Sequence, residues 1–86
     1  MKIEKKCWPE SFAKILSGKK TTELRLADWD CKSGDILVLQ EYDPKTQTYT
    51  GRTLEKEITF VMKTKEQPYF KKEDVEKYGF LILSLK

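Results

Sequence analysis

The residues best suited to chemistry lie in one stretch, from Gly18 to Arg25, which reads Gly-Lys-Lys-Thr-Thr-Glu-Leu-Arg. In a strand, Glu23 and Arg25 would fall on the same face about 6–7 Å apart, close enough to share one ligand. A guanidinium offers a rigid fork for phosphate or a planar acceptor, and a carboxylate accepts hydrogen bonds from the amino or imino groups of a base. Lys20 adds a positive charge near the start of the strand. These side chains predict a site for an RNA-like or nucleotide-like ligand.

The amino-acid composition excludes several kinds of catalytic site. The chain has no histidine, and serine or cysteine triads and most zinc enzymes use imidazole as base or ligand. Its two cysteines, Cys7 and Cys31, are too few for a four-ligand zinc site, and we expect both to be reduced. Catalysis would depend on lysine, hydroxyl or carboxylate groups, whose unperturbed pKa values lie away from neutrality. The composition thus favours binding over catalysis and predicts neither a metal nor a cofactor.

Length and hydropathy predict one domain over residues 1–86. Eighty-six residues suffice for a single hydrophobic core and are too few for two. No apolar run approaches the roughly 20 residues of a membrane-spanning helix, and the start, MKIEKKCWPE, lacks the apolar centre of a signal peptide. We therefore expect a cytoplasmic protein without a membrane partner. The net charge of +3 is too small to indicate nucleic acid by itself.

The elements that must position this stretch lie on either side of the glycine. Residues 2–7 are a candidate strand that runs into Pro9, whose fixed φ suits the first position of a helix. The apolar residues of this helix recur on one face and are Phe12, Ile15 and Leu16. Gly18 is placed to end the helix in a left-handed conformation. Over residues 19–26 the period changes to two, as in a half-buried strand.

Further strands are predicted downstream. A turn over residues 28–35 leads into Ile36–Leu39, an apolar run that we expect to form a central strand covered on both faces. The elements that follow are, in order, a hairpin loop over 43–51, a return strand over 52–63, a short helix within 71–78 and a buried strand over 80–85. This order predicts an α+β fold whose curved antiparallel or mixed sheet closes on itself, because a parallel layered sheet needs more crossover helices.

The pattern G-x-K-x-x-E-x-R, formed by Gly18, Lys20, Glu23 and Arg25 after a short amphipathic helix, resembles the signature of the ASCH domain of the PUA-like superfamily. The match extends downstream to Gly34-Asp35, before the predicted central strand. Three companion segments resemble a small, functionally uncharacterised bacterial and phage branch, and these are Trp8–Phe12, Leu39–Pro44 and Tyr49–Arg52. The resemblance covers nearly the whole chain. It implies a β-barrel-like fold of about five to six strands, with one main helix near the N-terminus and a short second helix. It also implies a cleft between barrel and helix, and a role in RNA binding or RNA-linked processes.

Two departures from that branch concern the expected site. Ile3 stands where the branch usually has a histidine, and Ala27-Asp28-Trp29 replaces an Asn-Asp-Arg turn, of which Asp28 is retained. Trp29, like Trp8, offers a stacking face for a base, and the alternative is a tryptophan that covers one edge of the core. The candidate ligand-binding residues are Lys20, Glu23, Arg25, Trp8, Trp29 and Asp28. No residue is assigned a catalytic role.

Three other roles stay open. Acetylcytidine amidohydrolases share the implied architecture and use a lysine and a threonine three residues later, and here Lys20 matches the lysine whereas Glu23 replaces the threonine. A small amidohydrolase acting on a modified nucleoside would therefore need Lys20 as its reactive group and Glu23 to move protons. In a second alternative, Glu23 and Arg25 form an ion pair that only holds a strand. In the third, the hairpin loop 43–51 contacts a protein partner.

Overall fold

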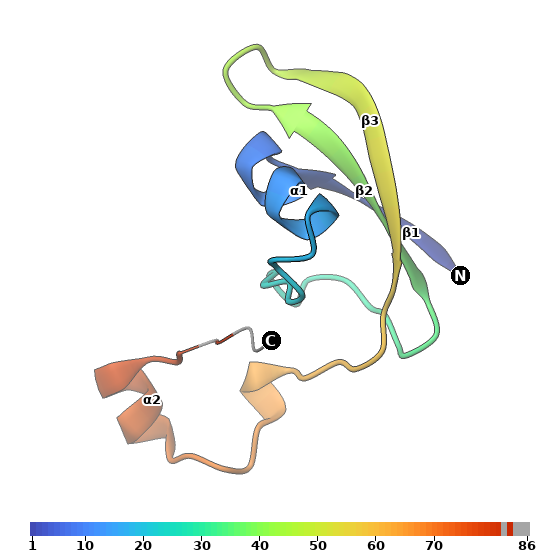
Figure 1. Ribbon diagram of the computed structural model, residues 1–86. Coiled ribbons are helices and arrows are strands. Elements are labelled where there is room, and N and C mark those ends of the chain that lie inside the picture. The colour runs from blue at the N-terminus through green and yellow to red at the C-terminus, as the bar shows by residue number, and fades with distance from the viewer. Residues whose placement is uncertain (82, 84–86) are drawn as a thin grey trace.

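A mixed three-stranded sheet with a helix packed on one face organises the N-terminal two thirds of the chain (Figure 1). The structure is a computed structural model that describes residues 1–81 and 83. Its elements, in chain order, are β1 (Lys2–Cys7), α1 (Pro9–Leu16), β2 (Ile36–Asp43), β3 (Thr48–Glu57), the 3-10 turn η1 (Thr64–Glu66) and α2 (Lys72–Tyr78). The strand order is β1-β2-β3, with β1 parallel and β3 antiparallel to β2. The described residues thus form a small α+β fold, as predicted.

The helix α1 begins and ends where the sequence predicts. Trp8 is extended (φ −68°, ψ 151°), Pro9 opens the helix and Leu16 is its last residue. Gly18 then adopts φ +82°, a conformation that an L side chain rarely takes. Beyond it, the backbone N–H of Lys20 donates to the carbonyl of Lys14 over 3.1 Å. The glycine therefore turns the chain back along the helix and fixes where the next segment starts.

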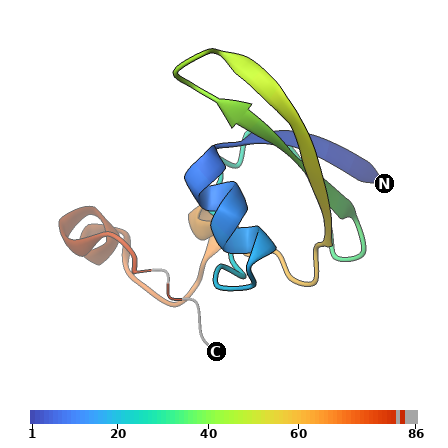
Figure 2. The same ribbon diagram turned by 45° about the horizontal axis from the view of Figure 1, so that its top comes forward.

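The hydrophobic core lies between α1 and the sheet, as both views show (Figure 2). Its buried members are Cys7, Phe12, Ile15, Leu37 and Leu39. Phe12 and Leu39 are each 1% exposed. Three half-buried residues complete the core, and these are Trp29, Leu54 and Ile58. By contrast, α2 lies apart from the sheet in both views.

The central strand β2 is paired on both edges but is not covered on both faces. Its apolar run alternates, since Leu37 and Leu39 are buried whereas Ile36 and Val38 are half-buried. The helix α1 packs on the face that carries Leu37 and Leu39, and among the described residues nothing comparable covers the other face (Figure 2). The prediction of a strand buried on both faces is therefore wrong for this part of the chain. Four consecutive apolar residues did not distinguish the two cases.

An ion pair between the buried carboxylate of Glu41 and the exposed side chain of Arg52 joins both strands of the hairpin to α1. Glu41 of β2 is 4% exposed and accepts hydrogen bonds from Nε and Nη2 of Arg52 at 2.9 and 2.8 Å, and from the hydroxyl of Thr50 at 2.6 Å. The Arg52 guanidinium also lies 4.9 Å from the centre of the Phe12 ring. The Arg52 and Thr50 hydrogen bonds hold the pKa of Glu41 at about 2, despite the opposing effect of burial. The carboxylate is therefore ionised whenever the protein is folded above that pH.

The return strand β3 starts and ends earlier than predicted. The hairpin turn is short, because β2 reaches Asp43 and β3 begins at Thr48. The last residue pair of the β2–β3 ladder is Ile36 with Glu57. Beyond it, the N–H of Ile58 donates to the carbonyl of Asp35, and the carbonyl of Ile58 accepts from the N–H of Gly34, both at 2.8 Å. Residues 59–63 have no strand partner because β2 starts at Ile36. The prediction that the strand continues to residue 63 is wrong for that reason.

Two further predicted strands are not seen among the described residues. Residues 19–26 are irregular, and the expected strand there is replaced by a loop held through side chains. Of the predicted strand over 80–85, Phe80 and Leu81 lie outside any strand, while residues 82, 84 and 85 lie outside the described part of the chain. The described residues thus form an open sheet of three strands, and a closed sheet of five to six strands is not seen among them.

Replacing Phe12 with alanine should remove most of the stability of the domain. Large-to-small changes at a buried phenylalanine cost about 3–5 kcal/mol, and a chain of this size is stabilised by only about 0.05–0.15 kcal/mol per residue. Urea unfolding followed by circular dichroism measures the loss. Leu16→Ala is the control, because Leu16 lies on the same helix but is 54% exposed. Equal losses for the two variants would contradict the assigned core.

Replacing Glu41 with glutamine should flatten the acid dependence of stability. The pKa of Glu41 is about 2 in the fold, below the ordinary value of 4.5, so its contribution is fully present above about pH 4.5 and is lost as the pH falls towards 2. Glu41→Gln should be less stable than wild type in urea at pH 7, and should lose less stability between pH 7 and pH 3. Glu55→Gln is the control, since Glu55 pairs with Lys2 on the exposed face. A wild-type pH dependence in Glu41→Gln would contradict the ion pair.

Candidate functional site

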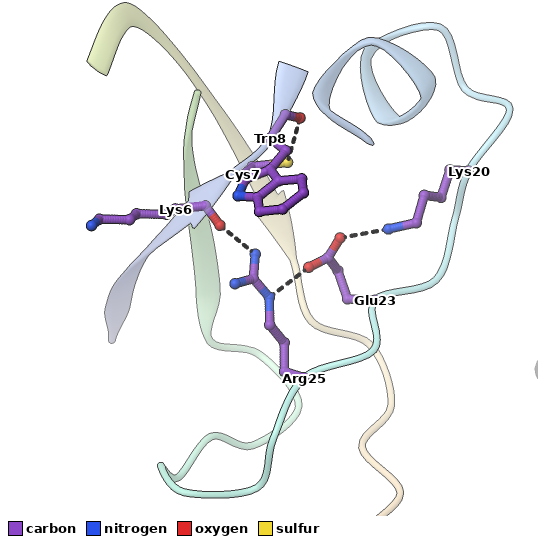
Figure 3. A network of polar contacts seen from close by, with 6 residues as sticks. All are labelled: Lys6, Cys7, Trp8, Lys20, Glu23 and Arg25. Carbon is purple, nitrogen blue, oxygen red and sulfur yellow. Dashed lines mark hydrogen bonds and ion pairs between the residues drawn. The ribbon is translucent and has the colours of Figure 1, made fainter. Parts of the chain in front are cut away.

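The loop over residues 19–27 brings the three predicted site residues together (Figure 3). The carboxylate of Glu23 lies between two cations. Its Oε1 accepts from Nζ of Lys20 at 2.8 Å, and its Oε2 accepts from Nε of Arg25 at 2.9 Å. The side chains of Glu23 and Arg25 are thus in contact, but the predicted strand that would place them on one face is not formed here.

A hydrogen bond to the open edge of the sheet fixes the position of this loop. Nη2 of Arg25 donates to the backbone carbonyl of Lys6 in β1 over 2.7 Å (Figure 3). Because β2 is the one strand that pairs with β1 among residues 1–81 and 83, the carbonyls on the other edge of β1 need a partner from outside this sheet. The guanidinium supplies that partner, so the arginine joins the candidate site to the first strand.

The network is half-buried and carries a net positive charge. The side chains of Lys20, Glu23 and Arg25 are 28, 23 and 29% exposed. One carboxylate between two cations leaves a charge of +1. An ammonium has three N–H groups and a guanidinium has five, so the contacts among these residues leave donors on both cations that a ligand oxygen can use. The network of Lys20, Glu23 and Arg25 is therefore a structural contact that still has N–H groups available for a ligand.

All three residues line an open hollow of about 1310 Å³ between α1, the sheet and the segment that follows β3. The loop forms one wall, from Lys20 to Ala27, and Leu37 and Leu39 of β2 form the floor. Apolar side chains from distant parts of the chain line the rest, including Phe60, Met62, Tyr69, Phe70 and Phe80. The hollow thus combines a charged end with a broad apolar and aromatic surface.

The other predicted ligand-binding residues, which are Trp8, Asp28 and Trp29, are not among the described residues that line this hollow. Trp29 is half-buried against the core, and the ammonium of Lys5 lies 4.2 Å from its ring centre. Trp8 is 58% exposed just before α1, and Asp28 is exposed in the turn. The alternative in which Trp29 covers an edge of the core therefore fits the structure better than a stacking role.

Cys7 lies next to the network but is not an activated nucleophile. Burial raises the pKa of its thiol, and the negative charge of Glu23 acts in the same direction, against smaller opposing effects from Ser11, Arg25 and Lys20. The thiol is 3% exposed and contacts the carbonyl of Trp8 at 3.7 Å (Figure 3). A protonated, buried thiol packs as a small apolar group.

Comparison with known proteins gives one family. Residues 3–84 match a family described as a domain of unknown function (DUF3850). The chain belongs to this family. No curated protein and no solved structure matched. The match extends over the sheet, α1, the loop that carries the candidate site and α2, so this DUF3850 domain includes every residue of the Lys20–Glu23–Arg25 network.

The described part of this DUF3850 domain contains neither a metal-binding cluster nor a membrane-spanning helix. Within residues 1–81 and 83, no group of three or more His, Cys, Asp or Glu side chains could hold a metal ion. None of the described helices is long and apolar enough to cross a membrane.

The sequence analysis missed the aromatic part of the hollow. No element or site residue is predicted over residues 64–70, yet Tyr69 and Phe70 line the hollow with Phe80. A local signal was present in Gln67-Pro68-Tyr69-Phe70, because a glutamine beside a proline and two adjacent aromatic residues is unusual in a solvated linker. The DUF3850 site is thus wider than its charged motif.

Replacing Glu23 with glutamine should loosen the loop over residues 19–27 while the sheet stays intact. Partly exposed ion pairs contribute about 0.2–1 kcal/mol each, so loss of both should speed amide hydrogen exchange in the loop by roughly fivefold. Exchange in β2 should not change. Glu10→Gln is the matched control, since it removes an exposed carboxylate from α1. Unchanged exchange in the loop would show that Glu23 does not hold it.

Proposed function

We propose that this DUF3850 domain binds RNA or a nucleotide-like ligand in the hollow, with Lys20, Glu23 and Arg25 as its polar contacts. The observation that carries this proposal is the meeting of these three side chains, within hydrogen-bond distance, on the wall of one hollow. A guanidinium beside an ammonium suits the oxygens of a phosphate. A carboxylate held between them suits the exocyclic amine of a base.

The moderate charge of the network favours recognition of a particular group over general attraction to polyanions. Glu23 neutralises one of the two cations, so the site attracts phosphate less strongly than a cluster of bare lysines would. The carboxylate of Glu23 also holds Lys20 and Arg25 in place before a ligand binds. Less conformational entropy is then lost on binding.

The resemblance to ASCH domains supports a finer proposal about the fold, namely a PUA-like curved barrel in the complete domain. Leu24 and Leu26 of the loop are 74 and 82% exposed, and Phe60 and Met62 after β3 are 74 and 57% exposed. All four line the hollow at alternate positions of their segments. Alternation of this kind is typical of strands with one face turned to an interior.

The binding proposal predicts a salt-dependent affinity that Arg25 controls. For a fluorescein-labelled single-stranded RNA 12-mer, log K should fall against log salt with a slope of about −0.7 per phosphate contacted. Arg25→Gln should weaken binding at low salt about tenfold and make the slope shallower by about 0.7. Fluorescence anisotropy measures both quantities, and circular dichroism shows whether the variant is folded.

Lys45→Gln is the matched control, because it removes one positive charge from the exposed hairpin turn. If Arg25→Gln unfolds, Lys20→Gln provides a second variant of the same site. Adenosine monophosphate as competitor separates a nucleotide site from one that needs a strand. Failure of the wild type to bind either ligand at low salt would overturn the proposal.

A second candidate function, hydrolysis of a modified nucleoside, is favoured by one contact. The amine of Lys20 lies 2.8 Å from Oε1 of Glu23, a distance at which a proton can pass between them. This reading predicts release of acetate from acetylcytidine, lost in Lys20→Ala and retained in Lys45→Ala. Chromatography of the nucleoside products measures turnover. Absence of product across acylated nucleosides would exclude it.

A further inference from the structure

A short turn presents two aromatic side chains to the same hollow that holds the charged network. Oε1 of Gln67 accepts from the backbone N–H groups of Tyr69 and Phe70, both at 2.9 Å. Nε2 of the same amide donates to the carbonyl of Phe70 at 3.0 Å. Pro68 restricts the backbone between Gln67 and Tyr69. Three hydrogen bonds from one half-buried side chain thus fix the direction in which these two residues leave the chain.

The aromatic rings form a connected but open surface. Tyr69 and Phe70 pack edge to face with ring centres 6.5 Å apart, and Phe70 lies 6.2 Å from Phe80 at an angle of 59°. Their exposed fractions are 69, 62 and 42%, in the order Tyr69, Phe70, Phe80. Rings that served only as core would leave much less of their surface in water. This group of three is hereafter the aromatic wall.

We propose that the aromatic wall stacks bases of a single-stranded RNA whose phosphates contact Lys20 and Arg25. The proposal rests on the function proposed above and names its ligand as a strand of more than one nucleotide. Every base has a π face, so exposed rings bind unpaired bases with little regard to sequence. Double-stranded RNA is excluded as the ligand, because its bases are already stacked and paired.

The size of the hollow favours a strand over a single nucleotide. Sites for one drug-sized molecule usually enclose about 300–1,000 Å³, and this hollow has about 1310 Å³. A mononucleotide on the charged network would leave the aromatic wall in water. Two or more nucleotides can occupy both parts at once.

The charges around the hollow match an anionic strand. Four described cations line it, Lys20, Arg25, Lys56 and Lys63, against the carboxylates of Glu23 and Glu57. Asp30, which is not among the lining residues, pairs with Lys63 at 3.2 Å. This pairing partly compensates the positive charge of Lys63. The lining remains positive, which suits phosphates along an apolar surface better than an apolar peptide.

Two labelled probes of the same length separate base stacking from phosphate binding. The first is a fluorescein-labelled oligoadenylate 12-mer, and the second is the corresponding abasic ribose-phosphate chain. Wild type should bind oligoadenylate at least tenfold more tightly than the abasic chain, since each stacked base contributes about 5- to 150-fold. Phe70→Leu should weaken oligoadenylate binding about tenfold and leave abasic binding unchanged.

Further variants test the wall and its support. Tyr69→Leu should act as Phe70→Leu does, and Gln67→Ala should reduce the preference for oligoadenylate although it removes no ring. Tyr78→Leu is the matched control, because Tyr78 is 73% exposed on α2 and is not among the described residues that line the hollow. It should bind both probes as the wild type does.

The outcomes separate this inference from the function on which it rests. If wild type binds both probes equally, or if Phe70→Leu and Tyr69→Leu both keep the preference for oligoadenylate, base stacking on the wall is wrong and phosphate binding at Lys20 and Arg25 stands. If wild type binds neither probe at low salt, both proposals are overturned.

Discussion

The burial of one face of α1 against β2 is the contact on which the rest of the structure depends. Phe12 and Leu39, each 1% exposed, lie at its centre, and the Arg52–Glu41 ion pair closes one side of it over the Phe12 ring. Once α1 is seated, the glycine at its end determines where the following loop starts. The loop can then reach the edge of β1, so the hydrophobic contact between α1 and the sheet sets the place of the polar network beside β1.

The polar network has a structural role, and this role does not conflict with the binding role that we propose for it. Its carboxylate satisfies two cations, and its guanidinium satisfies a strand carbonyl. Groups fixed in this way lose little freedom when a ligand arrives, which is how binding sites gain affinity without added charge. The aromatic wall is held in a similar way, because the Gln67 amide orders the backbone that carries Tyr69 and Phe70.

Local signals in the sequence predicted α1, its end at Gly18, α2 and the grouping of Lys20, Glu23 and Arg25, because capping residues and short periodicities act over a few residues. Strand extents were predicted less well. Residues 19–26 and 59–63 carry the alternation of strands, yet a strand also needs a partner, and the partner of β3 ends at Ile36. The aromatic wall depends on a fold that brings residue 80 beside residue 70, and the periodicity of the sequence does not predict this contact. Nor does it predict the pairing of Glu41 with Arg52, which are eleven positions apart.

The hydrogen bond from Arg25 to the Lys6 carbonyl also bears on how copies of this chain behave toward one another. A strand edge with unpaired carbonyls is a template onto which a second chain can add, and natural proteins commonly place a charged group there. The guanidinium occupies such a carbonyl on β1 and brings a positive charge to the edge. An arginine of the candidate site thereby also guards this edge against pairing with a second chain, so one substitution at Arg25 would release both the loop and the exposed strand edge.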